Sequence, residues 1–166
     1  MPSNIYMQVK KDGAQEKGDC TVKGYEGYTE VQAVNFGVSM PTTGFSNAQP
    51  SCGKPQVQDV MVSKIYDAIS PILFQNCCKG DILEVTLIFT KAIGGSNESH
   101  PYLTVVLTNA IVSSIHVGVS EGSEASENMA FAFSNIAWTY KPVVAGGKAA
   151  AQTLPRKYDI PTNQNT

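Results

Sequence analysis

The sequence predicts a mainly β fold, in which two packed antiparallel sheets form a barrel or sandwich beside one short α-helix. Several short runs alternate apolar and polar residues with a period of two, which is typical of half-buried strands. Only one stretch, at about residues 70–79, carries helix start and stop signals. A third segment, at about residues 39–56, is rich in proline, glycine and small polar residues, and it predicts a long extended loop.

The predicted strands recur along most of the chain. Each has one apolar face for the core and one polar face for solvent, as in antiparallel sheets. Residues 101–110 and 111–120 are interpreted as two successive strands. The four apolar faces consist of Ile5, Met7 and Val9; Leu83, Val85, Leu87 and Phe89; Leu103, Val105 and Leu107; and Ile115, Val117 and Val119.

Two further runs change their apolar face midway. Around residues 28–38, Val31 and Ala33 share one face before the alternation shifts by one residue. Around residues 131–140, Phe131 and Phe133 are followed by an apolar set of the opposite parity. An extra residue near Ser134-Asn135 would keep both sets toward the core, which predicts a β-bulge there. The alternative is a strand that is buried on both faces.

The helix is predicted from its ends. Ser70 has the character of an N-cap, and Pro71 suits the first helical position because that position needs no backbone N–H. Lys79 and Gly80 form a typical stop signal. At about 100° per residue, one apolar stripe predicts four side chains facing the core: Leu73, Phe74, Cys77 and Cys78.

The adjacent cysteines on this helix are interpreted as core residues. Neighbouring Cα atoms lie about 3.8 Å apart, below the usual span of a disulfide. Neither histidine lies at metal-ligand spacing, and the negative end of the helix dipole disfavours a thiolate. Redox-sensitive, catalytic and metal-binding roles remain alternatives. The four cysteines, which are expected to be reduced thiols, are Cys20, Cys52, Cys77 and Cys78.

Other candidates for chemistry lack the necessary arrangement. Ser114 and His116 share a strand face, but Ser113 points to the opposite side. The acidic residues Glu121, Glu124 and Glu127 lie in a Gly/Ser-rich stretch, which predicts a solvated hairpin loop with casual cation binding as an alternative. The chain has no Walker A spacing. We therefore expect no catalytic, metal-binding or cofactor-binding residues.

Composition limits the possible partners. The net charge is −2 and no basic cluster is present, which argues against nucleic acid. Charged residues make up only 16% of the chain, which suggests surface used for contact with other chains. The N-terminal segment lacks a signal-peptide pattern, and no apolar run is long enough for a membrane span, so a cytoplasmic location is expected.

Four segments in order resemble the haemolysin-coregulated proteins, the Hcp family of type VI secretion systems. They are the Ser-Pro-Ile-Leu-Phe-x-x-Cys-Cys-x-Gly helix, the Val-Ser-Ser unit within residues 102–118, FAFSNIAWTYKP at 131–142, and FGVSMPTTG at 36–44. The resemblance spans about residues 5–142 and implies a single Hcp-like β-barrel domain over residues 1–142. Residues 143–166 are expected to form a partly ordered or flexible C-terminal tail.

The resemblance also implies an assembly. Family members form rings of six subunits, which stack into a hollow inner tube that sheath contraction expels and that carries effectors. A homohexamer with spike, sheath and effector partners is implied, as is secretion without a signal peptide. The expected ring-stacking loop comprises Met40, Pro41, Thr42, Thr43, Gly44, Phe45, Ser46 and Asn47. Cys20 and Cys52 do not belong to the four matching segments. Because the family's long loop maps onto residues 40–56, Cys52 is expected to cross-link rings on oxidation if it lies in an inter-ring loop.

Two other functions remain open at this point. A monomeric β-barrel that binds a small apolar ligand would have an enclosed cavity. A thiol enzyme would expose a reactive Cys77 or Cys78. Oligomeric state and thiol reactivity distinguish these alternatives from a tube subunit.

Overall fold

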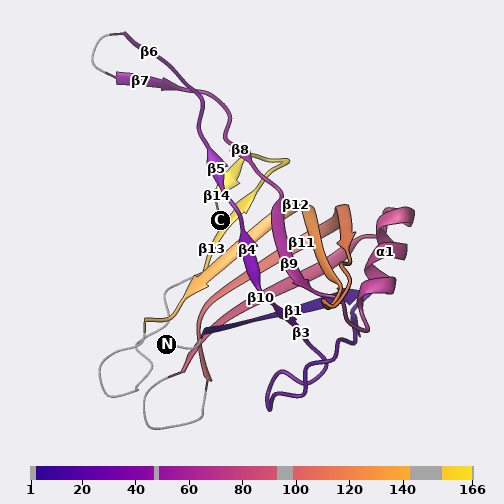
Figure 1. Cartoon of the computed structure of the whole chain (residues 1–166). Coiled ribbons are helices and arrows are strands. Elements are labelled where there is room, and N and C mark those ends of the chain that lie inside the picture. Colours follow the sequence, from indigo (N-terminus) through magenta and orange to yellow (C-terminus); the bar gives the residue numbers. More distant parts are fainter. Residues whose placement is uncertain (1–2, 47–48, 93–98, 143–154, 166) are drawn as a thin grey trace.

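The computed structural model describes residues 3–46, 49–92, 99–142 and 155–165. The described part is mainly β with one helix, as predicted, and its strands pair antiparallel (Figure 1). The elements are β1 (Ser3–Lys11), β2 (Ala14–Glu16), β3 (Thr29–Val31), β4 (Ala33–Asn35), β5 (Val38–Ser39), β6 (Thr42–Ser46), β7 (Gln49–Cys52), β8 (Gln56–Val57), β9 (Val60–Ile65), α1 (Ser70–Lys79), β10 (Leu83–Ala92), β11 (Ser99–Gly118), β12 (Ser126–Tyr140), β13 (Arg156–Asp159) and β14 (Gln164–Asn165).

The strands form two layers that share β11. One layer runs β3-β1-β10-β11, and the other runs β4-β9-β12-β11. The strand predicted around residues 28–38 is interrupted at Gln32, so that β3 pairs with β1 while β4 pairs with β9. This interruption explains why the apolar face changes along residues 28–38, because each short strand belongs to a different layer.

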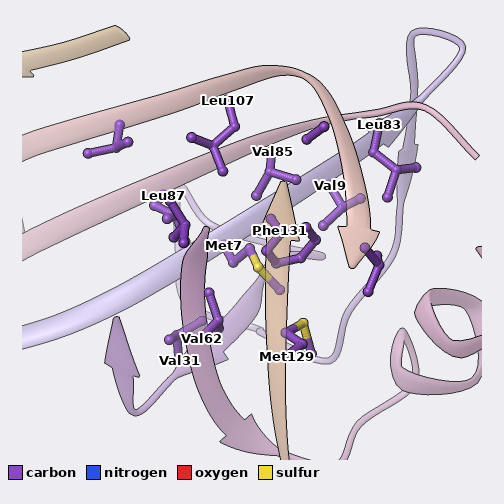
Figure 2. Packing of buried hydrophobic residues seen from close by; sticks show 14 of the residues in the cluster. Met7, Val9, Val31, Val62, Leu83, Val85, Leu87, Leu107, Met129 and Phe131 are labelled. Atoms are coloured by element: carbon purple, nitrogen blue, oxygen red, sulfur yellow. The ribbon is translucent and has the colours of Figure 1, made fainter. Parts of the chain in front are cut away.

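The core lies between the layers. The predicted apolar faces of β1 and β10 are confirmed, since Met7, Val9, Val85 and Leu87 are fully buried. Figure 2 shows these side chains converging with residues of β3, β9, β11 and β12, including Phe131. Removing such apolar surface from water contributes about 25 cal/mol per Å² and supplies most of the driving force for folding.

The helix bounds are confirmed, but two details of the helix prediction are wrong. The N-cap residue is Ile69 rather than Ser70, and no side chain caps the first turn. The predicted core stripe holds for Leu73, which is fully buried, but Phe74 is 54% exposed and Cys78 is exposed. The stripe that is buried instead contains Ser70, Leu73 and Asn76.

The physical cause of this different rotation is a set of buried hydrogen bonds at the start of α1. The Ser70 hydroxyl donates to Glu127 Oε1 at 2.7 Å and accepts from Lys64 Nζ at 2.8 Å. These buried bonds set the rotation of the helix about its axis and turn Phe74 and Cys78 outward. The helix ends as predicted, because Gly80 takes a left-handed conformation with φ 67° and its N–H bonds to the last turn.

The predicted bulge near Ser134-Asn135 is not present as an extra residue. Leu107 pairs with Ile136 and Ala110 with Phe133, so the register of β11 and β12 is unchanged across this point. Instead, both strands switch at the same point which of their two faces is buried. This point lies beside Asn109, whose φ is 50°. The register shift lies instead between Val112 and Ser114.

Two other segments differ from the strand prediction. Residues 101–120 form one long strand through Gly118 rather than two, and the expected core residue Val117 is 45% exposed. Beyond the predicted domain boundary, β13 pairs with β12 and β14 pairs with β13. Residues 143–154 of the predicted tail lie outside the described residues. Within the described residues, no helix is long and apolar enough to cross a membrane.

Candidate assembly surfaces

The predicted long loop is largely a β-ribbon. Strands β4 and β9 continue outward as β5 paired with β8, and then as β6 paired with β7. Figure 1 shows β6 and β7 projecting away from the rest of the molecule. Among the described strands, β6 and β7 pair only with each other, so neither has a second sheet neighbour in this part of the chain.

The expected ring-stacking residues lie along this ribbon. Met40 is 47% exposed between β5 and β6, and it is followed by exposed Pro41 and Thr42. Thr43, Gly44, Phe45 and Ser46 belong to β6, whereas Asn47 lies outside the described residues. Gly53 donates its backbone N–H to the Pro41 carbonyl at 2.9 Å, which joins the two ribbon strands between their ladders.

An apolar groove lies between the base of the ribbon and the sheet. Its ribbon side includes Phe36, Val38 and Met40, which are 47%, 67% and 47% exposed. Its sheet side includes Trp138, which is 39% exposed. Among the described residues that line the groove, none has a charged side chain. They are Phe36, Gly37, Val38, Met40, Pro55, Val57, Gln58, Leu103, Phe133, Ile136, Trp138, Tyr158 and Asn165.

The outer face of the layer β4-β9-β12-β11 is also almost free of charge. Cross-strand partners share a face, and register places Ser63 beside both Ala33 and Asn128. His116 is the only ionisable group on this face among the described residues, and the Ser63 hydroxyl lies 2.5 Å from Asn128 Oδ1. The side chains of this uncharged face are Ala33, Asn35, Met61, Ser63, Ile65, Ser126, Asn128, Ala130, Ser114, His116 and Gly118.

The inner face of the same layer contains a buried ion network that sequence reasoning missed. Lys64 Nζ lies 2.5 Å from Asp67 Oδ1 and 2.5 Å from Glu127 Oε1, and the Lys64 and Glu127 side chains are 0% exposed. The prediction that Glu127 belongs to a solvated hairpin loop is therefore wrong. The sequence did contain a signal for the burial of Glu127. Glu127 lies two residues before the apolar Met129, so period-two alternation places both side chains on the core face.

The cysteines occupy four different environments, and none is in a disulfide. Cys77 is partly buried against the core, Cys78 is exposed on α1, and Cys52 is exposed on β7. Cys20 is 8% exposed, and burial raises the pKa of its thiol. The placement of Cys52 on the ribbon agrees with the exposure that its predicted cross-linking requires.

The remaining candidates do not form a reactive site in the described part of the chain. The Ser113 hydroxyl donates to Asp59 Oδ2 at 2.7 Å and to the Ala130 carbonyl at 3.1 Å, while His116 lies on the uncharged face. Within the described ranges, no group of three or more His, Cys, Asp or Glu side chains has a metal-binding arrangement.

The fold and these surfaces define a β-sandwich protein whose prominent exposed features suit contact with other chains. The sequence profile described as "Type VI secretion system effector, Hcp" matches residues 6–140. The chain therefore belongs to the Hcp family, as the four ordered segments indicated.

Known proteins agree with this assignment. Protein hcp1 of Pseudomonas aeruginosa is 31% identical over 113 residues, which is 68% of each chain. A structure described as a type six secretion system protein has a TM-score of 0.88 at 22% identity, covering 99% of this chain and 100% of its own. Hcp1 from Salmonella typhimurium has a TM-score of 0.75 at 21% identity, with full coverage of both chains. These structural similarities show the shared fold.

Proposed function

We propose that this chain is a subunit of the inner tube of a type VI secretion system. Six copies close into a ring, rings stack into a hollow tube, and sheath contraction expels the tube with its effector cargo. The function is physical rather than catalytic. Its partners are further copies of itself together with the spike, sheath and effector proteins, and the protein leaves the cytoplasm without a signal peptide.

The ribbon is the observation that carries the proposal. It extends the β4-β9 ladder beyond the body of the subunit, and its distal strands pair only with each other among the described strands (Figure 1). Free strand edges and exposed apolar side chains such as Val38 and Met40 favour association with another chain. The family match supports a secretion-system context for that association.

The uncharged face supplies a candidate lumen wall. A conduit for different proteins needs a surface without strong charges that would bind some cargoes and repel others. The neighbouring layer differs, because its outer side carries the exposed Lys10–Glu84 ion pair at 3.7 Å. We therefore orient the layer β4-β9-β12-β11 toward the lumen and the layer β3-β1-β10 toward the outside.

Light scattering coupled to size exclusion tests the ring. A species near six times 17.8 kDa supports the proposal, and a monomer at all concentrations contradicts it. Negative-stain microscopy then checks for rings and stacks.

Labelling tests the orientation in a background where Cys52 and Cys78 are serine. N128C should lose reactivity toward a bulky maleimide-polyethylene glycol when rings stack, whereas E84C on the other layer should keep it. Equal labelling of both variants in stacks would contradict the assigned lumen face.

The apolar groove favours one alternative, a monomer that binds a small apolar ligand. The groove is open, with Val38 67% exposed, whereas this alternative predicted an enclosed cavity. Native mass spectrometry distinguishes the two, because a monomer carrying a small bound molecule would support the alternative.

A further inference from the structure

We propose that His116 makes the assigned lumen face responsive to pH, so that it holds acidic polypeptide more tightly below about pH 6 than above about pH 7. The inference rests on the proposed function, because it names a change of charge on the surface that cargo would pass. Three features of the molecule support it: the position of this histidine, the lack of other charges on its face, and its repetition around a ring.

His116 lies on β11 within the uncharged face. Its cross-strand partner is Asn128 of β12, which in turn pairs with Ser63 of β9. His116 is exposed, so its imidazole can meet a molecule that passes over this face. Histidine is the side chain that ordinarily changes charge between pH 5 and 8. Among the described residues of this face, His116 is therefore the group that can give the face a charge in that range.

The neighbours of His116 on the same face would not offset a new charge. On β11 they are Ser114 and Gly118, and on β12 they are Ser126 and Ala130 beside the partner asparagine. Each of these side chains is uncharged. A proton on His116 therefore changes this part of the face from neutral to positive.

The titratable and charged groups of the adjoining elements lie off this face. They are Glu121 and Glu124 in the turn after β11, Asp59 and Tyr66 at either end of β9, Cys77, Cys78 and Lys79 on α1, which packs against β11, and the ion network of Lys64, Asp67 and Glu127 on the core side. The carboxylates of Glu121, Glu124 and Asp59 are exposed, so water and salt screen them. They weaken a positive charge on the face without removing it.

A ring repeats this charge. In a closed ring of six copies, every subunit presents the same residue at the same height, so one proton on each subunit gives six positive charges. Stacking repeats this belt along the tube. An acidic segment in the lumen would be attracted to the protonated imidazoles, whereas a basic segment would be repelled. Acidification should thus favour retention of acidic cargo and release of basic cargo.

The size of the effect follows from the charges. Two opposite charges about 4 Å apart in water attract each other enough to strengthen binding about fivefold. A peptide that contacts more than one imidazolium should gain more, because its later contacts form within the same complex. The gain should shrink as salt is added, since exposed charges are screened.

Peptide binding to purified rings tests the inference. The probe is a rhodamine-labelled peptide of alternating aspartate and serine, which keeps its charge between about pH 5.5 and 7.5. Fluorescence anisotropy at low salt measures its affinity. His116→Gln removes the titrating group, and His116→Lys places a permanent positive charge there. His100→Gln is the matched control, because His100 is the other histidine of the chain and lies at the far end of β11, paired with Lys91.

The unmodified protein and His100→Gln should bind the peptide at least about fivefold more tightly at the lower pH. His116→Gln should lose this difference, and His116→Lys should bind tightly at both pH values. A difference that survives in His116→Gln, or that is lost equally in His100→Gln, would overturn the inference.

A blocking experiment locates the bound peptide. In the background where Cys52 and Cys78 are serine, N128C rings modified with maleimide-polyethylene glycol should lose peptide binding, because Asn128 is the cross-strand partner of His116. E84C rings modified in the same way should keep it, because Glu84 lies on the other layer. Equal binding by both modified proteins would overturn the assignment to this face.

Light scattering on the same samples separates this inference from the proposed function. Intact rings whose peptide affinity does not depend on pH would refute the role of His116 and leave the tube subunit in place. A protein that remains monomeric at both pH values would refute both.

Discussion

Replacing Lys64 with methionine tests the buried ion network most directly. Methionine keeps much of the length and apolar stem of lysine but removes the ammonium group. The change leaves Glu127, with 0% side-chain exposure, and Asp67, with 14%, without the cation that lies 2.5 Å from each. Removing one partner of a buried pair costs about 3–5 kcal/mol, because the remaining charge stays desolvated and unpaired.

The expected loss is large for a chain of this size. One kcal/mol shifts the melting temperature by about 2–4 °C in a domain of 150–250 residues, so Lys64→Met should lower it by about 6–20 °C. Urea unfolding, followed by Trp138 fluorescence and circular dichroism, gives the free energy itself. All variants are compared at one protein concentration, because the proposed assembly would contribute to apparent stability.

A surface ion pair provides the matched control. Lys10 and Glu84 lie 3.7 Å apart with side chains 37% and 46% exposed, so Lys10→Met should cost less than about 1 kcal/mol. The double variant K64M/E127L should be more stable than K64M, because it removes both charges from the core. Similar losses for Lys64→Met and Lys10→Met, or a double variant less stable than K64M, would refute the reasoning.

Three further predictions concern the helix and the thiols. Leu73→Ala should lower the free energy of unfolding in urea by about 2–5 kcal/mol, because Leu73 is fully buried. Phe74→Ala should lower it much less, because Phe74 is 54% exposed. Equal losses for the two variants would contradict the observed rotation of α1. Gly80→Ala should cost about 1 kcal/mol because φ is 67° at this position, and an unchanged urea midpoint would count against that conformation. At neutral pH, Cys52 should react with iodoacetamide faster than Cys20, because Cys20 is buried and burial raises the pKa of its thiol, so that less thiolate is present. Peptide mass spectrometry measures both rates, and faster modification of Cys20 would contradict the burial argument.

Local signals made much of the fold predictable. Pro71 and Gly80 mark the start and end of α1 because their backbone preferences act within a few residues. The faces of β1 and β10 follow from period-two alternation, because each strand has one side against the core. The four ordered motifs made the family identifiable from the sequence alone.

The missed features depend on partners distant in sequence. Lys64 and Glu127 are joined by strand pairing, and the network they form with Ser70 sets which side of α1 is buried. A helical wheel considers only apolar periodicity, so it could not place a polar residue at the centre of the buried stripe. The boundary predicted between residues 110 and 111 likewise lies within one long strand, β11, in which Asn109 takes a left-handed conformation.

The candidate surfaces also combine features that the local sequence predicts with features that depend on partners distant in sequence. The composition of residues 39–56 indicated a segment with a special role, and Met40 and Pro41 do lie exposed on it. Its ribbon structure depends on pairing between β5 and β8 and between β6 and β7, for which the sequence lacks clear alternation. The groove could not be predicted, because residues from β5, β8, β11, β12, β13 and β14 line it together.

The continuity of the ribbon with the body has a mechanical consequence. Tension on the tip would pass along the chain into β4 and β9, and from β9 into its antiparallel neighbour β12. Hydrogen bonds in an antiparallel ladder lie perpendicular to the strands, so a pull along β9 loads many bonds in shear at once instead of opening them one at a time. The Lys64–Glu127 ion pair joins the same two strands, so it adds an electrostatic contact between the strands that would bear the tension. We therefore expect the root of the ribbon to resist axial force and the distal strand pair β6–β7 to yield first.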